Sequence, residues 1–349
     1  MFEKTLKICL IGVTVCLMAG PVCAESEWDF YGSVRLSTFQ DNFSKEASST
    51  GKDRSNMSLD MNSNSRIGAK IKNDEFNAGF EYGSTPNLRK LFGRWKTEYG
   101  HLMIGQHYTP ANIVISNQTH NGGGALLNVG GLYTGRNPQI LFKTKIGLMF
   151  SAVKPNAYDT VGLGNTTTSL PAIEARYDFT AGRLSGGVVY GTKSFKSEST
   201  TKSVSVSASV MGAFARVKLG ATKFAFNIIS STNPGNYGQW LEGGSTTATY
   251  DASTDSLTNA TTTGFILVGS LTISETISFE TGYGSQSNKS GISGDKEDET
   301  TAIYVQLPIK WTSAIFITPE IGFYDYVKDS SGTKKGSNTY FGVNWKFDF

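Results

Sequence analysis

The sequence has no cysteine beyond its N-terminal segment. All three cysteines, Cys9, Cys16 and Cys23, lie within residues 1–24 of the 349-residue chain. If that segment is removed, the remaining chain, 25–349, has no disulfide, no thiolate nucleophile and no cysteine-based zinc site. Its stability must then come from packing and hydrogen bonding alone.

The N-terminal segment has the parts of a secretory signal peptide. Lys4 and Lys7 supply a basic start, residues 8–20 form an apolar run, and the small residues at 22–24 suit a cleavage site. We therefore expect residues 1–24 to be removed on export.

The rest of the chain lacks both long apolar runs and an excess of charge. Hydrophobic residues make up 38% of the sequence, charged residues 17%, and the net charge is +3. Without a further run of about 20 apolar residues, the chain cannot be a helical membrane protein. So small a basic excess also argues against nucleic acid as a partner held by bulk charge.

Apolar residues instead alternate with polar or small residues, which is the period of a β-strand. At the end of the chain Phe341, Val343, Trp345, Phe347 and Phe349 share one face. This apolar face continues to the final residue without a polar cap, which favours an apolar solvent beyond it. The same alternation predicts sixteen strands, near 27–39, 64–72, 75–83, 89–98, 100–107, 137–144, 147–154, 170–179, 182–192, 208–219, 221–230, 262–272, 275–284, 301–311, 314–326 and 337–349.

The predicted connections alternate between long and short. An outer-membrane barrel has this asymmetry, with long external loops and short periplasmic turns. Because lipid leaves no backbone group unpaired, such strands must close into a barrel, and sixteen strands leave an aqueous lumen. The predicted fold class is an all-β transmembrane antiparallel β-barrel over residues 25–349. The long connections are 40–63, 108–136, 155–169, 193–207, 231–261, 285–300 and 327–336.

Pro308 and Pro319 fall inside predicted strands, so we expect a bulge or a displaced boundary there.

Several short motifs occur in order along these strands. They are Phe30-Tyr31-Gly32-Ser33-Val34-Arg35, Ser65-Arg66-Ile67-Gly68, Phe76-Asn77-Ala78-Gly79-Phe80-Glu81-Tyr82, the stretch from Tyr99 to Pro110, and the C-terminal Phe349. With them nearly the whole of 25–349 resembles the trimeric general porins of Gram-negative outer membranes. The resemblance implies a water-filled channel for passive diffusion of small hydrophilic solutes and ions. It also implies a homotrimer in contact with outer-membrane lipid and lipopolysaccharide, with Phe349 as the signal read by the barrel assembly machinery.

The resemblance further implies that residues 108–136 form a constriction loop that folds into the lumen. Glycines in this segment suit sharp backbone turns, although an ordinary external loop is the alternative. The family places basic residues on the inner wall of its early strands. By strand parity the candidates here, for which generic barrel lining is the alternative, are Arg35, Arg66, Lys70, Arg94, Lys96 and Lys143, with Arg136 at the end of the loop.

The chain departs from the family pattern in its acidic residues. No Asp or Glu occurs between Glu98 and Asp159, so the loop cannot supply the carboxylates that usually face the basic wall. Charged rings set ion preference in channels, and a constriction lined by Arg and Lys lowers the energy of anions. The sequence therefore predicts weak anion selectivity, or at least a reduced preference for cations.

Other functions find little support in the sequence. His101 and His107 would lie about 20 Å apart on one strand, so with His120 they predict no metal site, and no cofactor is expected. No serine motif accompanies them, so we expect no enzyme. A substrate-selective porin remains an alternative, because Phe92, Tyr304, Phe316 and Tyr324 could face the lumen. A structural or adhesin barrel with a filled lumen is the alternative from another class.

Deletion of Phe349 should leave the protein in the periplasm, because the assembly machinery would lose its terminal signal. The measurement is the fraction of heat-modifiable barrel in isolated outer membranes, compared with the unaltered chain. Normal assembly without Phe349 would remove this role from the residue.

Overall fold

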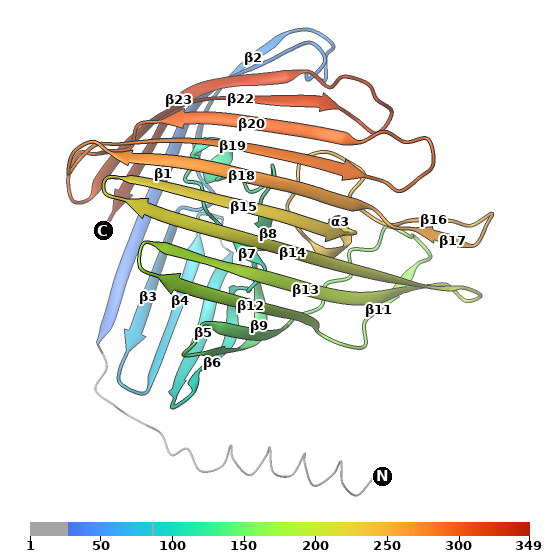
Figure 1. The fold of residues 1–349 in the computed structure, drawn as a ribbon, viewed down its shortest axis with the longest axis horizontal. Helices are drawn as coiled ribbons and strands as arrows, with labels where there is room; N and C mark the ends of the chain where they lie inside the picture. Colours follow the sequence, from blue (N-terminus) through green and yellow to red (C-terminus); the bar gives the residue numbers. More distant parts are fainter. Residues whose placement is uncertain (1–26, 86) are drawn as a thin grey trace, which may run out of the picture.

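Nineteen strand segments form one antiparallel sheet that closes on itself (Figure 1). The computed structural model describes residues 27–349 except residue 86, so the predicted signal peptide at 1–24 lies outside the described residues. The segments of the first half of the sheet are β1 (Trp28–Phe43), β2 (Arg54–Met61), β3 (Arg66–Lys72), β4 (Phe76–Gly83), β5 (Leu88–Thr97), β6 (Gly100–Tyr108), β9 (Arg136–Thr144), β10 (Leu148–Val153), β11 (Asn165–Thr167) and β12 (Ala172–Ala181). Those of the second half are β13 (Leu184–Glu198), β14 (Ser203–Leu219), β15 (Thr222–Thr232), β18 (Thr261–Thr272), β19 (Ser278–Lys289), β20 (Asp298–Gln306), β21 (Ile309–Lys310), β22 (Ile315–Lys328) and β23 (Ser337–Asp348).

These segments occupy sixteen positions in the wall of the barrel, which confirms the predicted fold class. β2 and β3 both pair with β1, β11 and β12 both pair with β13, and β20 and β21 both pair with β22, so each pair of segments makes one wall position. The barrel closes where β1 pairs with β23, with Leu36 opposite Trp345. Closure leaves no strand edge unpaired, as a lipid environment requires.

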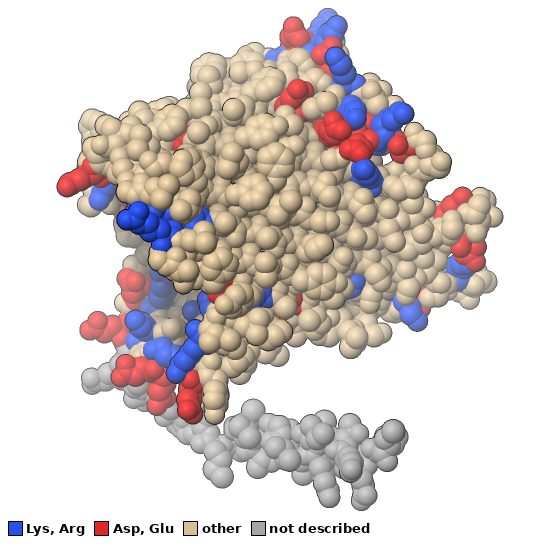
Figure 2. All heavy atoms as spheres, in the orientation of Figure 1, with Lys and Arg blue, Asp and Glu red and all other residues tan. Residues whose placement is uncertain are grey.

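Alternating side chains give the wall an apolar outer face and a polar inner face. On β1, Phe30 and Val34 on one face are exposed, whereas Ser33 and Ser37 on the other face are buried. Figure 2 shows the outer surface over β12–β22 covered by uncharged residues, with lysine, arginine, aspartate and glutamate gathered at the two rims. This distribution matches a barrel surrounded by hydrocarbon and bounded by water at both ends.

The two rims differ in the length of their connections. At the periplasmic rim Asn73 closes a tight turn, because its side-chain oxygen accepts the backbone N–H groups of Glu75 and Phe76. Gly182 and Gly220 adopt positive φ in two other turns at this rim, which glycine does without strain. At the external rim, long connections include β16 (Thr249–Asp251), β17 (Ser256–Thr258) and the short helix α3 (Pro234–Tyr237).

Three details differ from the predicted strands. Residues 40–63 are not one loop, because β1 continues to Phe43 and β2 pairs with it above the membrane-facing part of the wall. β20 ends at Gln306, so the strand boundary near Pro308 is displaced, while the register is kept from Gln306 opposite Glu320 to Ile309 opposite Ile317. Pro319 lies inside β22 without a bulge, opposite Val343. No helix among the described residues is long and apolar enough to cross a membrane.

Candidate functional site

The connection between β6 and β9 lies against the inner wall of the barrel. It contains β7 (Asn112–Ile113), which pairs with β8 (Leu132–Tyr133), and the short helix α2 (His120–Gly123). We call residues 109–135 the inner loop. Its apolar side chains are buried with inward residues of β13, β14, β15 and β18 in one hydrophobic core, to which the loop contributes Ala111, Ile113, Ile115, Leu126, Val129 and Leu132.

Three glutamates on the wall accept backbone N–H groups of the inner loop. They lie on β12, β19 and β22, and all three are at least 94% buried. Such charge-assisted bonds are stronger than neutral ones, and they satisfy loop donors that have no strand partner. The bonds run from Ala111 N to Glu174 (2.7 Å), from Asn117 N to Glu280 (2.9 Å), and from Thr119 N to Glu320 (2.6 Å).

Each of these glutamates also accepts a hydrogen bond from a tyrosine hydroxyl. The pairs are Tyr237 with Glu174 (3.1 Å), Tyr304 with Glu280 (2.6 Å) and Tyr340 with Glu320 (2.9 Å). Burial and the nearby Glu174 raise the pKa of Tyr237, which lies in α3, so this phenol stays protonated and donates. The carboxylate oxygens are therefore engaged within the protein.

Two arginines on the same wall bind carbonyl oxygens of the inner loop. Arg176 Nη1 donates to Asn112 O at 2.7 Å, and Arg216 Nη2 donates to Val114 O at 2.8 Å. The wall thus supplies carboxylates to the loop's N–H groups and guanidinium groups to its C=O groups. Both kinds of backbone group are paired, so the loop is held as an ordered layer.

The inner loop approaches the wall most closely at glycines. Gly130 has φ +81°, and a Cβ there would collide with the backbone oxygen of Phe265. On the wall, a Cβ at Gly284 would collide with Val129 O, and one at Gly264 would lie 2.8 Å from Gly130 Cα. The absence of side chains at these positions allows the two backbones to touch.

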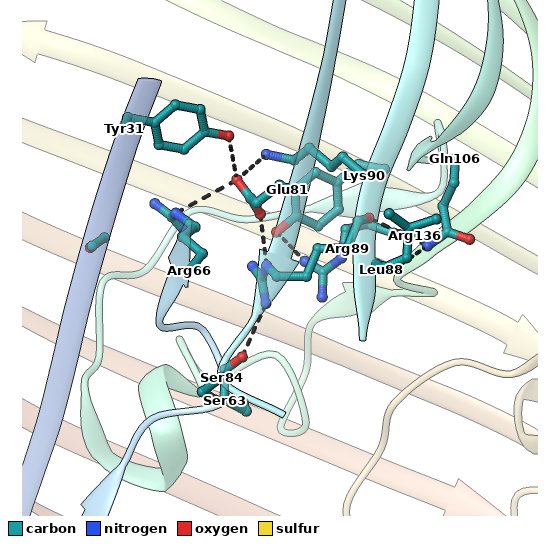
Figure 3. Close-up of polar contacts among 12 residues, drawn as sticks. Tyr31, Ser63, Arg66, Glu81, Ser84, Leu88, Arg89, Lys90, Gln106 and Arg136 are labelled. Atoms are coloured by element: carbon teal, nitrogen blue, oxygen red, sulfur yellow. Dashed lines mark hydrogen bonds and ion pairs between the residues drawn. The ribbon is translucent and has the colours of Figure 1, made fainter. Parts of the chain in front are cut away.

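The wall of β1–β6, on the other side of the lumen, carries a basic cluster around one carboxylate (Figure 3). Glu81 accepts from Arg89 Nε at 2.7 Å, from Lys90 Nζ at 3.0 Å and from the Tyr31 hydroxyl at 3.0 Å. Arg66 Nε lies 3.7 Å from the same carboxylate. Three cations therefore surround one anion, and the cluster keeps a net positive charge.

The other predicted pore residues lie near this cluster or towards the rims. Arg35 Nε donates to Ser33 Oγ at 3.1 Å, and its side chain lines an internal cavity. Arg136 donates to the Tyr108 hydroxyl at 2.7 Å. The remaining four are spread along β3, β5 and β9: Lys70 lies over the Tyr31 ring, Arg94 lies 3.8 Å from the Met103 sulfur, Lys96 donates to Asn73 O, and Lys143 is opposite His101 in the ladder.

Sequence reasoning missed Arg89, Lys90 and Glu81 as members of the cluster. Lys90 has the same strand parity as Arg94, so its inward direction could have been predicted. Arg89 could not, because it faces inward only through a register shift between Glu81 and Tyr82. That shift is a β-bulge, which places two neighbouring residues on one face.

The aromatic and histidine residues that the sequence singled out lie at different places inside the barrel. Tyr304 and Tyr324 face inward but are buried beneath the inner loop, where they bond Ser116 and Gln118, so they do not line a free path. His120 Nε2 lies 2.9 Å from Asp41 Oδ1. No group of three or more His, Cys, Asp or Glu side chains suited to a metal ion is found in the part of the chain that the structure describes.

The C-terminal residue completes the seam of the barrel. Phe349 N donates to Gly32 O at 3.1 Å, and Gly32 N donates to Phe349 O at 2.7 Å. The Phe349 ring lies directly over the Cα of Gly32, where a Cβ would collide with it, and remains 65% exposed on the outer face.

Comparison with known proteins agrees with this architecture. Solved structures with the same fold include the outer membrane channel DcaP of Acinetobacter baumannii (16% identity, TM-score 0.74, covering 95% of this chain and 100% of that one). OmpT of Vibrio cholerae is 15% identical (TM-score 0.63, 95% and 100%), and an anion-selective porin from Comamonas acidovorans is 12% identical (TM-score 0.62, 93% and 100%).

Sequence comparison gives the family. No curated protein matches the chain. Residues 12–307, however, match the family described as Gram-negative porin. With its sixteen-stranded barrel and polar interior, the chain belongs to the Gram-negative porin family and forms a channel of the outer membrane for passive diffusion of small hydrophilic solutes.

Proposed function

We propose that this porin prefers anions and that the inner loop, within the predicted 108–136, narrows its channel. The proposal rests on one observation, which is that the wall carboxylates bind the inner loop. Glu174, Glu280 and Glu320 are all bonded to the loop and buried. The charges left facing the solute path are then mainly those of arginine and lysine.

The wall of β1–β6 supplies the cations of the proposed constriction. Arg66, Arg89 and Lys90 share the single carboxylate of Glu81. Among the described residues, no carboxylate lies within ion-pair distance of Arg94 or Arg136. Fixed positive charge beside a narrow aqueous path raises the local concentration of anions and lowers that of cations.

We also propose that the chain works as a homotrimer, exported by its signal peptide, without enzymatic activity. The outer face of β3–β5 has small residues at Ala78 and Gly93, bordered by the exposed Ile67 and Trp95, while Ala69 on the same face is covered by its neighbours. Small side chains allow close approach of a second barrel. Membership in the porin family supports the same assembly.

The reversal potential under a salt gradient should have the sign of an anion-preferring channel. Replacing two cations that have no carboxylate partner, Arg94→Gln with Arg136→Gln, should lower the anion-to-cation permeability ratio by roughly twofold, because ions in the narrow path lie within a Debye length of both groups. A matched control, Lys45→Gln with Lys334→Gln on external loops, should change it little. A cation-preferring sign in the unaltered channel would refute the proposal, and absence of any conductance from folded barrel would favour the structural or adhesin alternative.

Removing two of the glutamates that hold the inner loop should give a larger single-channel conductance or one that flickers. Glu280→Ala with Glu320→Ala leaves loop N–H groups and two tyrosine hydroxyls without acceptors, at a cost of about 1–3 kcal/mol for each unsatisfied group. We expect larger or flickering conductance steps in a planar bilayer. Glu299→Ala, which removes a partly exposed carboxylate paired with Lys328, is the control. A steady, unchanged conductance in the double variant would mean that the loop does not limit the path.

In a planar bilayer the trimer should give conductance steps that close in groups of three. In native mass spectrometry it should have three times the mass of one chain. Gly93→Arg on the outer face of β5 should yield monomers that are still folded, because a charge there opposes close packing of two apolar faces. A Lys223→Arg variant keeps its charge inside the barrel and serves as the control. A monomeric mass for the unaltered protein would contradict this assembly.

A further inference from the structure

A second basic region lies between the inner loop and the periplasmic rim. There a cavity of about 950 Å³ is bounded by loop residues 114–119 on one side and by turns at the short-loop rim on the other. The turns include the one between Lys218 and Lys223, the one that contains Glu275, and the one that follows Lys310. We call this cavity the periplasmic vestibule.

The vestibule is strongly basic. Seven arginine or lysine residues line it, against two glutamates. One of these, Glu280, already accepts bonds from Asn117, Tyr304 and Gln306. The other, Glu275, lies in an exposed turn at the rim. The cations are therefore poorly neutralised by the protein itself.

One wall of the vestibule places like charges side by side. Lys218 and Lys223 are directly opposite in the β14–β15 ladder, and Lys218 N donates to the backbone oxygen of Arg183 at 3.1 Å. Like charges opposite one another destabilise a sheet. In the described part of the chain no carboxylate pairs with any of these three residues, so the arrangement has no evident benefit for folding.

The other wall presents a second basic row. Lys310 is opposite Phe316, Phe316 is opposite Lys346, and Lys346 is opposite Arg35, so their side chains share the inner face. Lys346 Nζ lies 3.9 Å from the centre of the Phe316 ring and 2.7 Å from Asp348. Lys310 has no such carboxylate partner among the described residues.

From this arrangement we infer that the periplasmic vestibule binds compact polyvalent anions, such as condensed phosphates or tricarboxylates, at the channel's inner end. A polyvalent anion would neutralise several closely placed ammonium groups at once, and the cavity is large enough to hold it. The inference deepens the proposed anion preference, on which it rests. It adds a site distinct from the cluster around Glu81.

The test is block of the full-length channel in a planar bilayer by inorganic tripolyphosphate, added to one side at a time. Orientation is read with Ser293→Cys, a thiol in the external segment 290–297 that an impermeant reagent reaches from outside. We expect block at lower concentration from the periplasmic side. Lys218→Gln with Lys223→Gln should raise the half-blocking concentration from that side about tenfold, since two charges close to the anion are lost.

A matched double variant, Lys45→Gln with Lys334→Gln, removes the same charge from external loops and should leave periplasmic block unchanged. If the vestibule double variant does not fold, Lys310→Gln tests the opposite wall alone. Equal block from the two sides, or no difference between vestibule and control variants, would overturn the inference. The reversal potential of the same channels in simple salt tests the proposed anion preference separately, so a cation-preferring channel that still shows sided block would refute only that preference.

Discussion

The structure depends on the need to pair every backbone N–H and C=O group that lipid surrounds. A hydrocarbon environment offers no water to replace a missing partner. The seam between β1 and β23 meets this need, including the two bonds between Gly32 and Phe349. Closure then fixes the rest: every second side chain faces outward, where apolar residues predominate, and the others face an interior that can hold charge.

The same need for pairing applies to the inner loop. A loop that lies inside the barrel cannot pair with a neighbouring strand along its length. Its donors bind glutamates of the wall, and carbonyls at Asn112 and Val114 bind Arg176 and Arg216. These carboxylates are buried behind the loop, whereas arginines and lysines elsewhere on the inner wall face water, and the proposed anion preference depends on this difference.

The sequence was sufficient to predict the strands of the barrel, but it was not sufficient to predict the contacts inside it. Alternation located the strands because the apolar face of a lipid-exposed strand is continuous, as from Phe341 to Phe347. The same alternation puts Glu174 and Glu280 on the polar face of their strands. It could not show that these carboxylates meet Ala111 and Asn117, because contacts between wall and loop depend on the closed barrel. The β-bulge that turns Arg89 inward has no signal in residue type.

Two basic regions in series suit transport better than one strong site. A single dense cluster would hold a polyvalent anion and slow its release, whereas conduction needs binding that is favourable but weak enough to leave. At the proposed constriction Glu81 offsets part of the charge of Arg66, Arg89 and Lys90. Beyond the inner loop, Lys218 and Lys223 offer the next attraction while remaining open to water, where screening limits its strength. Under the proposed anion preference, an anion that leaves the first region therefore meets a second, weaker attraction on its way to the periplasm.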